Sequence, residues 1–368
     1  MRISSVEIYG YDLTYAGDRY VMSGGQVVQG LPSTVVRIVT DEGADGWGEV
    51  CPLGALYLEA HAPGARAALD AFAPAVLGLD PTNIGSVHRA MDAALRGHMY
   101  ARSPIDVACW DLLGNALGLP VTTLLGGRLQ DDFPLYRAVP LGPVREMAAF
   151  VEEQRRHGIR HFQVKIGEAP EVDAERVATV AGSTETGDRI IADANGGYLL
   201  QDAVRAARLL EPLERVYFEQ PCRSLEDCAA VRERTSLPVI LDESIVDARS
   251  LLRAQRNHAL EAFNLKIGKY GGLTGARFMR DLARELGLRV TIEDSWGGDL
   301  VTAAVSHLAA ATPEEHVFTV SFMNDWTNEH VAGYRPRSIA GRGSAPSAPG
   351  LGVEVDIDML GEPLAIYR

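Results

Sequence analysis

Lysine is scarce in this chain, and the few lysines present fall at informative places. The 368 residues include only three lysines, Lys165, Lys266 and Lys269, against 32 arginines. Arginine stays protonated in proteins, whereas a lysine whose surroundings lower its pKa can exchange a proton near neutral pH. Because arginine serves almost everywhere as the surface cation, the remaining lysines are candidates for proton transfer.

Two of these lysines belong to a regularly spaced series that also contains carboxylates. The series is Lys165, Asp193, Glu219, Asp242, Lys266 and Glu293, with steps of 28, 26, 23, 24 and 27 residues. Each step is about one strand–helix unit, which predicts that the members stand at the ends of successive strands. Three interposed carboxylates would repel one another and require a cation, and oxygen ligands favour Mg²⁺ or Mn²⁺ over zinc.

The pattern of apolar residues supplies the strands that this spacing requires. From about residue 134, eight short apolar runs occur at 134–140, 161–167, 189–195, 216–221, 238–244, 262–268, 289–295 and 316–322. Helical patterns lie between them, for example at 144–157, 201–210, 224–234, 272–286 and 300–311. This alternation predicts an α/β fold, a (β/α)8 barrel with its active site at the C-terminal ends of the strands. An open doubly wound sheet is the alternative, but no glycine-rich phosphate turn follows its first strand.

Residues 1–130 have a different order and predict a separate α+β domain. Three strands are expected at 2–13, 34–40 and 44–50, followed by helices at 62–76, 83–95 and 104–117. Ser103 is the expected N-cap of the third helix, with Pro104 as its first residue. The barrel then occupies 131–349. We expect the tail, 350–368, to pack back on the first domain, with a last strand at 353–358.

Composition excludes several classes of protein. The formal charge of −14 argues against nucleic acid and anionic membranes as partners, because binding either requires a basic face. The four cysteines show no metal-binding spacing, and neither a signal peptide nor a membrane-spanning run is recognisable. We therefore expect a cytoplasmic enzyme that acts on a small molecule.

The residues at the strand ends fit one type of reaction. A carbon acid next to a carboxylate loses its proton when the resulting ene-diolate is neutralised, and a divalent cation can do this. A lysine whose pKa is lowered by that cation and by burial would take the proton, and the second lysine lies across the barrel. A Schiff-base aldolase using Lys266 is an alternative from a different reaction class. A non-catalytic descendant is a third, although no lysine or carboxylate of the series is missing.

Six motifs carry a resemblance to a known family. QVKIG (163–167), DANGGY (193–198), FEQP (218–221), LDES (241–244), NLKIG (264–268) and IEDSWGGD (292–299) resemble the muconate-lactonizing subgroup of the enolase superfamily. The resemblance covers the whole chain and implies a modified (β/α)8 TIM barrel with an N-terminal α+β capping domain. It implies Asp193, Glu219 and Asp242 as Mg²⁺ ligands, with Lys165 and Lys266 as the acid/base pair. Gln163 replaces a lysine that many members carry, and it is expected behind the ligands together with Asn195 and Glu243.

Within that subgroup the chain is similar to cis-3-hydroxy-L-proline dehydratases, over 51–58, 91–114 and 266–274. The same stretches are similar to 2-epimerases of proline betaine and hydroxyproline betaine. The resemblance implies dehydration of cis-3-hydroxy-L-proline to Δ1-pyrroline-2-carboxylate, with 2-epimerisation as the alternative outcome. The substrate would be a cyclic amino acid or its betaine, and the protein a homo-oligomer. Expected substrate contacts are Tyr57, Glu293, Asp294 and Trp296, covered by the loops at 15–25 and 52–61.

Overall fold

The computed structural model describes residues 1–17 and 19–368, which form two main sheets of different construction. The first is an antiparallel sheet in the order β16-β1-β4-β5. Its strands are β1 (Ile3–Thr14), β4 (Gly30–Thr40), β5 (Asp45–Val50) and β16 (Ala365–Tyr367). The turn between β4 and β5 places Gly43 at a φ of 82°, a conformation that glycine adopts without a Cβ clash. The three strands expected in the first 50 residues are therefore confirmed.

Three helices accompany this sheet, the first and third packed on it and the second packed on those two helices, and the third corrects a prediction. They are α1 (Ala62–Val76), α2 (Ile84–Ala94) and α3 (Met99–Leu117). The prediction that Ser103 caps α3 and Pro104 begins it was wrong, because both lie buried inside a helix that starts at Met99. Packing explains the longer helix: α3 lies so close to β5 that a Cβ at Gly48 would be 2.1 Å from the carbonyl oxygen of Pro104. Tertiary burial here outweighs the local capping signal.

The second sheet is the predicted barrel. Eight parallel strands follow one another in the order β7 to β14, and a single parallel bridge from Leu135 to Val320 joins the ends of the sheet. The strands are β7 (Tyr136–Val139), β8 (His161–Lys165), β9 (Arg189–Asp193), β10 (Val216–Glu219), β11 (Val239–Leu241), β12 (Ala262–Lys266), β13 (Arg289–Glu293) and β14 (Val317–Val320). Each falls within one of the eight apolar runs.

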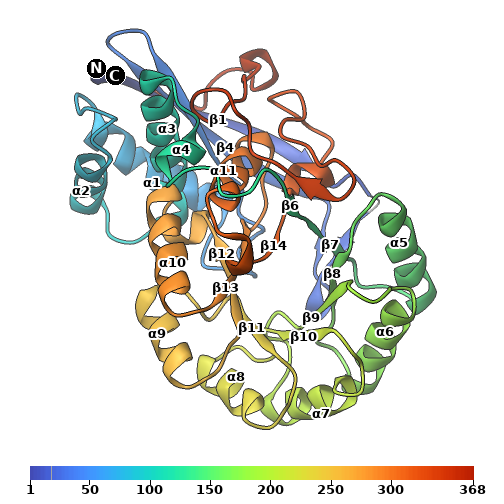
Figure 1. The fold of residues 1–368 in the computed structure, drawn as a ribbon. Helices are drawn as coiled ribbons and strands as arrows, with labels where there is room; N and C mark the ends of the chain where they lie inside the picture. The colour runs from blue at the N-terminus through green and yellow to red at the C-terminus, as the bar shows by residue number, and fades with distance from the viewer. Residues whose placement is uncertain (18) are drawn as a thin grey trace.

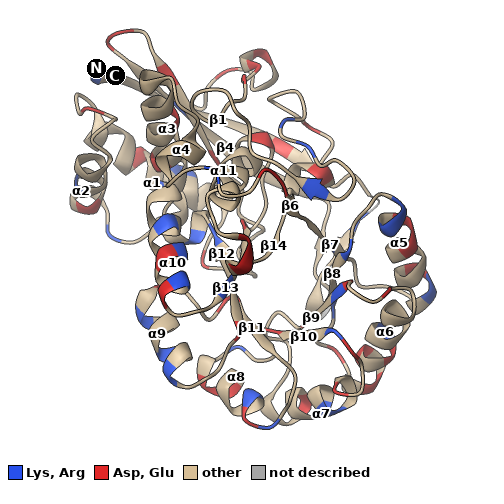
Figure 2. Cartoon of the chain, viewed as in Figure 1, with Lys and Arg blue, Asp and Glu red and all other residues tan. Residues whose placement is uncertain are grey.

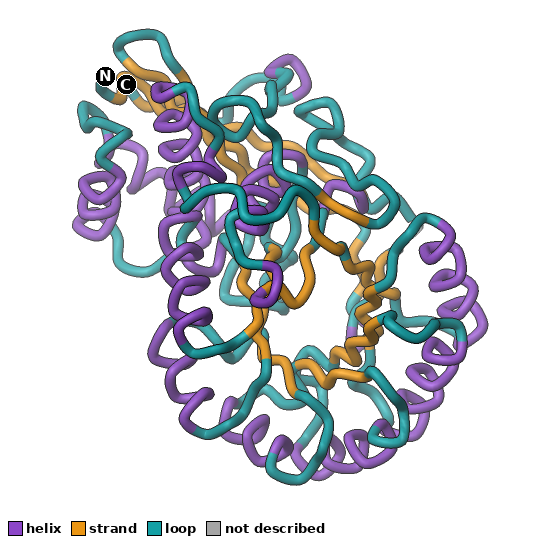
Figure 3. The backbone as a smooth tube through the Cα atoms, in the orientation of Figure 1, coloured by secondary structure: helices purple, strands orange, loops and turns teal. Residues whose placement is uncertain are grey.

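Helices surround this barrel on the outside (Figures 1 and 3). They are α5 (Val144–Arg156), α6 (Pro170–Gly182), α7 (Leu200–Leu210), α8 (Leu225–Arg232), α9 (Ala248–Arg256), α10 (Leu273–Glu285) and α11 (Asp299–Ala310). Figure 2 shows charged residues along the outer helices from α5 to α10, whereas the strands of the barrel wall are mostly uncharged. In the part of the chain that the structure describes, no helix combines the length and apolarity needed to cross a bilayer.

Short elements complete the connections. They are β2 (Tyr20–Val21), β3 (Val27–Val28), α4 (Val121–Leu124), β6 (Phe133–Pro134), β15 (Arg342–Gly343) and the 3₁₀ turns η1 (Ser23–Gly25), η2 (Gly268–Tyr270), η3 (Glu314–His316), η4 (Met323–Trp326) and η5 (Ile357–Met359). The last strand expected at 353–358 was wrong: part of that segment is η5, and no strand forms there. The strand forms later, at β16, because β1 offers an unpaired edge to residues 365–367.

The N-terminal segments reach over the C-terminal ends of the barrel strands. Ser23 Oγ donates a hydrogen bond to Asn195 Oδ1 (3.2 Å), and the backbone N–H of Leu141 donates to Val21 O (2.9 Å). The loop expected at 15–25 includes Asp18, which lies outside the described residues. This arrangement places the segment around η1 next to the strand ends that carry the predicted catalytic residues.

Candidate active site

The spaced series converges at one end of the barrel. Lys165, Asp193 and Glu219 are the last residues of β8, β9 and β10, and the strand register pairs them at one level. Asp242 directly follows β11. All four side chains are almost completely buried. A buried charge is costly unless it is paired, so these groups must neutralise one another or a bound ion.

The two lysines stand on opposite sides of this cluster. β8 and β12 are four strands apart in a barrel of eight, and Lys266 ends β12 as Lys165 ends β8. Lys165 Nζ lies 2.5 Å from Asp193 Oδ2. Lys266 Nζ lies 2.6 Å from Asp242 Oδ2 and 2.5 Å from Glu293 Oε1. Each lysine therefore faces the carboxylates from its own side.

These ion pairs determine the protonation of the lysines in the absence of other ligands. Burial by itself lowers the pKa of Lys165, but the carboxylate of Asp193 outweighs it, and the pKa is raised. The pKa of Lys266 is raised in the same way, with Asp242 and Glu293 opposing the effect of burial. If the carboxylates moved away from the lysines, the pKa of each lysine would fall, because burial would then act without opposition.

Two amides hold Glu219 from either side. Gln163 Nε2 and Asn264 Nδ2 both donate to Glu219 Oε1, at 3.0 and 2.8 Å. Burial raises the pKa of Glu219 well above its usual value, and the charges of Asp193 and Asp242 raise it further. Asn264 was not predicted from the sequence, although a signal was present: an amide stands two residues before each strand-end lysine, and side chains two apart share a strand face.

Glu243 and Asn195 flank the same carboxylates. Asn195 Nδ2 donates to Glu243 Oε1 (3.0 Å), and the backbone N–H of Asn195 donates to Asp193 Oδ1 (2.9 Å). Among the residues described, Glu243 Oε2 is buried without a hydrogen-bond partner. Burial, followed by the charges of Asp242 and Asp193, raises the pKa of Glu243 to about 8. The buried carboxylates of this cluster thus carry more negative charge than the surrounding protein groups neutralise.

The donor set suits a hard divalent cation. Outside position 18, no three His, Cys, Asp or Glu side chains are arranged to hold an ion as they stand. The reason is visible in the ion pairs, since the ammonium groups of Lys165 and Lys266 occupy carboxylate oxygens that an ion would use. The three carboxylates offer only oxygen ligands, and together with the unpartnered Glu243 Oε2 they fit Mg²⁺ or Mn²⁺ in composition and charge.

Asp242 also receives two groups from outside its own strand. Tyr57 in the N-terminal region donates from its hydroxyl to Asp242 Oδ2 (2.6 Å), and Lys269 Nζ lies 3.2 Å from Oδ1. Burial opposes ionisation of Asp242, but Lys266 and Lys269 hold its pKa below the usual value. Lys269 is not a solvent-exposed lysine, because its side chain is only 7% exposed. Lys269 instead adds positive charge to the cluster.

The predicted substrate contacts line one small cavity between the two lysines. Its volume is about 30 Å³, and its lining includes Tyr20, Tyr57, Lys165, Lys266, Glu293, Asp294, Trp296 and Trp326. That space is about the share of one water molecule in the liquid. Asn195 and Glu243 are not part of this lining. A larger hollow of about 680 Å³ adjoins it and shares Tyr57 and Asp294.

Aromatic rings form one wall of the small cavity. The centroid of Trp296 lies 5.5 Å from that of Tyr20 and 5.6 Å from that of Trp326. Trp296 is 1% exposed, and its Nε1 has no hydrogen-bond partner within residues 1–17 and 19–368. This wall combines the faces that attract an organic cation with one free N–H donor.

Glu293 and Asp294, the two acidic residues expected to contact the substrate, have different hydrogen-bond partners. Glu293 accepts hydrogen bonds from Lys266 and from the hydroxyl of Tyr136. Asp294 accepts from the backbone N–H groups of Gly268 and Ser295, each at 2.7 Å, and burial raises its pKa to about 6. Asp294 therefore fixes the loops after β12 and β13 whether or not it touches a substrate.

Family models match most of this architecture. Residues 20–126 match the mandelate racemase/muconate lactonizing enzyme N-terminal domain, and residues 146–359 match the enolase C-terminal domain-like model. The chain belongs to the mandelate racemase/muconate lactonizing enzyme family of the enolase superfamily, as the motifs at the strand ends predicted. Curated relatives include a dehydratase and a racemase, so the protein is an enzyme of this superfamily, and solved structures of superfamily members share its fold.

The similarity to individual relatives extends over the whole chain. A cis-3-hydroxy-L-proline dehydratase of Roseibium aggregatum is 44% identical over 367 residues, covering 100% of both chains. An N-succinyl-L-Arg/Lys racemase of Bacillus cereus is 27% identical, covering 100% of this chain and 99% of the relative. A crystal structure of an enolase superfamily member from Roseovarius nubinhibens ISM, complexed with magnesium, has a TM-score of 0.93 at 37% identity and covers 100% and 99% of the two chains.

Proposed function

We propose that the protein is a Mg²⁺-dependent hydro-lyase that converts cis-3-hydroxy-L-proline into Δ1-pyrroline-2-carboxylate. The observation that carries the proposal is the pair of buried lysines facing one another across three carboxylates. The similarity to a cis-3-hydroxy-L-proline dehydratase over the full length supports the choice of substrate. The Schiff-base alternative for Lys266 has no comparable support in the relatives.

The lysines would act on opposite faces of the ring. One ε-amine removes the proton from C2, and the hydroxyl at C3 departs with a proton supplied from the site, leaving water and a C2=C3 double bond. Tautomerisation to the C=N double bond then gives the product. Because each lysine approaches from its own side, the configuration at C2 decides which one acts as the base.

Asp193, Glu219 and Asp242 would hold the cation. A divalent ion bound there neutralises the negative charge that develops on the substrate carboxylate as the C2 proton leaves. Gln163 and Asn264 keep Glu219 in place for this task, and Glu243 with Asn195 supports the neighbouring carboxylate of Asp193. Mn²⁺ satisfies the same ligands and is an alternative to Mg²⁺.

The substrate would lie between the lysines and the aromatic wall. The ring ammonium is expected to face Glu293 or Asp294 and the ring of Trp296, whose free N–H offers a further contact. Tyr57 contributes its hydroxyl from the capping side. Because the cavity now has room for about one water, these capping segments must move to admit the substrate, and the adjoining hollow provides the path.

Epimerisation of proline betaine or 4-hydroxyproline betaine is the second candidate. The aromatic wall of Tyr20, Trp296 and Trp326 favours it, because aromatic faces bind quaternary ammonium groups that cannot donate hydrogen bonds. The same two lysines would then remove the C2 proton from one face and return a proton to the other.

Proton NMR in D₂O distinguishes the two activities directly. Cis-3-hydroxy-L-proline, proline betaine and 4-hydroxyproline betaine are each incubated with enzyme and Mg²⁺. The proposal predicts loss of the C3 hydroxyl from the first compound and formation of the pyrroline. Deuterium at C2 with inversion of a betaine would instead establish the epimerase. No change in any of the three would exclude both substrate assignments.

A further inference from the structure

A second large hollow opens at the opposite end of the barrel. Its volume is about 680 Å³, and it lies where β8, β9 and β13 begin, lined by His161, Arg189 and Arg289, the first residues of those strands. His161 and Lys165 share the same face of β8, four residues apart, which is about 13 Å along a strand. The hollow is therefore separate from the site described above.

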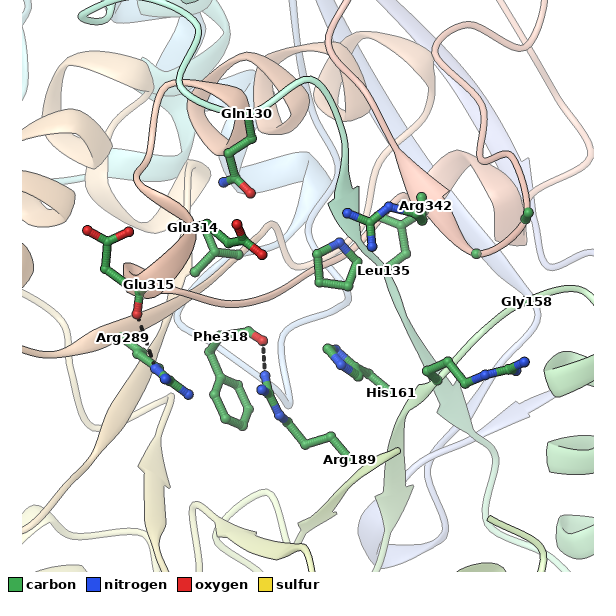
Figure 4. A pocket seen from close by; sticks show the side chains of 15 residues that line it. Gln130, Leu135, Gly158, His161, Arg189, Arg289, Glu314, Glu315, Phe318 and Arg342 are labelled. Carbon is green, nitrogen blue, oxygen red and sulfur yellow. Dashed lines mark hydrogen bonds between the residues drawn. The ribbon is translucent and has the colours of Figure 1, made fainter. Parts of the chain in front are cut away.

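Arginines dominate this lining in an otherwise acidic protein. Arg160, Arg189, Arg289 and Arg342 contribute four positive charges against two from Glu314 and Glu315, whereas the whole chain carries −14. Figure 4 shows Arg189, Arg342, Arg289 and His161 arranged around the hollow. A concentration of one charge sign in a concave, low-dielectric surface focuses the potential towards ligands of the opposite sign.

These four arginines differ in their partners. Arg160 lies 3.7 Å from Asp188, and Arg342 lies 2.6 Å from Asp132. For Arg189 and Arg289, no ion pair occurs within the described ranges 1–17 and 19–368. Both guanidinium groups donate instead to backbone carbonyls, Arg189 to Phe318 O and Arg289 to Glu315 O. Their charge is thus available to a ligand.

The basic groups are close enough to repel one another. Burial, followed by the charges of Arg189 and Arg342, lowers the pKa of His161 to about 3. The imidazole is therefore neutral, with Nδ1 hydrogen-bonded to the hydroxyl of Thr319 (3.1 Å). Burial also lowers the pKa of Arg189, and the nearby charge of Arg289 adds to the effect. An anion placed between them would relieve this repulsion.

We propose that this hollow binds a small polyanion carrying two or more phosphate or carboxylate groups. Guanidinium groups bind both by paired hydrogen bonds, and four arginines around one space favour several anionic groups over one. The volume lies in the range of ligand sites for metabolites. The guanidinium of Arg189 stacks on the ring of Phe318 at 4.4 Å, which holds this charge beside the hollow.

Calorimetric titration of the Mg²⁺-loaded enzyme tests this proposal with two probes. Fructose 1,6-bisphosphate represents phosphates and tricarballylate represents carboxylates, at constant ionic strength. We expect at least one probe to bind, and the stronger of the two identifies the preferred anionic group. Arg289→Gln and Arg342→Gln should each weaken that binding about tenfold, because each removes a charged donor at an exposed position.

A matched variant controls for net charge. Arg205→Gln removes one exposed arginine of α7 that pairs with Glu171 and does not line the hollow, and it should leave binding unchanged. Arg189→Gln is unsuitable as the sole test, since its guanidinium also bonds Phe318 O. Absence of binding by both probes would overturn the proposal. Weakening of equal size by Arg205→Gln would overturn it as well. So would binding that is unchanged in Arg289→Gln and Arg342→Gln and that competes with cis-3-hydroxy-L-proline.

Discussion

A buried carboxylate keeps its orientation only when neighbouring groups hold its oxygens, and Glu219 shows how this is done. Gln163 and Asn264 reach the same oxygen, Oε1, from strands on either side. The other carboxylate oxygen would then be available to a bound ion. Neither amide is ionisable, so neither competes with a cation for the charge of Glu219. Their contribution would be to the affinity of the metal site.

We predict that Gln163→Met and Asn264→Leu, which keep the approximate side-chain size, each weaken Mg²⁺ binding by about 10- to 100-fold. Calorimetric titration with MgCl₂ measures the effect independently of turnover. Gln201→Met on the exposed surface of α7 is the matched control and should bind Mg²⁺ as the parent protein does. Unchanged affinity in both amide variants would refute this role.

Residue types and spacing were enough to select the strand-end positions, because parallel strands in a barrel bring every unit to the same edge. They did not reveal that Lys269 is buried against Asp242, since that depends on how the loop after β12 folds back. They also did not reveal that Tyr57 bonds Asp242, because 185 positions separate the two residues. Long-range contacts of this kind leave no periodic signal.

At the scale of elements, α11 links two distant segments through His307. His307 Nδ1 accepts a hydrogen bond from the backbone N–H of Thr122 in α4 (3.1 Å), and Nε2 lies 2.9 Å from Leu351 O in the tail. These contacts require the neutral imidazole. Burial lowers the pKa of His307 to about 4, and the charge of Arg128 contributes in the same direction.

The hydrogen bonds of the neutral His307 predict that the stability of the protein depends on pH. Between about pH 6.5 and 4 the unfolded chain takes up a proton on His307 and the folded chain does not, so the free energy of unfolding falls as pH falls. At pH 5 the loss relative to pH 7.5 should be about 2 kcal/mol. His307→Gln, compared with the parent by urea unfolding across this range, should remove that part of the slope. Parallel curves for the two proteins would disprove the assignment.

Close packing of β5 against α3 gives a second prediction at this scale. A Cβ at Gly48 would meet the carbonyl oxygen of Pro104 at 2.1 Å, whereas a Cβ at Gly30 would meet nothing within 4 Å. Gly48→Ala should therefore lower the free energy of unfolding by about 3 kcal/mol, and Gly30→Ala should change it little. Urea unfolding of both variants measures the difference, and equal stabilities would show that the helix shifts freely.

Elements with a repeating apolar pattern were predicted well, and their exceptions have physical causes. The eight barrel strands lie inside the predicted runs because each is buried on both faces and reads as continuously apolar. The start of α3 and the strand at 353–358 were wrong because local signals were weighed without the sheet that buries α3 and the β1 edge that recruits 365–367. The domain boundary near residue 130 stays a prediction.

For the whole molecule, the excess of buried negative charge predicts stabilisation by metal. An ion that binds only the folded chain raises the free energy of unfolding by about 2.7 kcal/mol at a hundredfold excess over its Kd. We expect urea unfolding in MgCl₂ to be shifted accordingly relative to EDTA at equal ionic strength. Asp193→Asn should abolish most of the shift. A shift of the same size in that variant would place the ion elsewhere.

The proposed function rests on proton transfer by Lys165 and Lys266, one as the base at C2 and the other as the acid. The most direct measurement is the rate of C2–H cleavage of cis-3-hydroxy-L-proline in D₂O with Mg²⁺, for Lys165→Ala, Lys266→Ala and the parent enzyme. We expect product formation to fall by at least about 100-fold in each variant. Deuteration at C2 should persist only in the variant that keeps the lysine acting as the base. Product formation by either variant within a few-fold of the parent rate would contradict it.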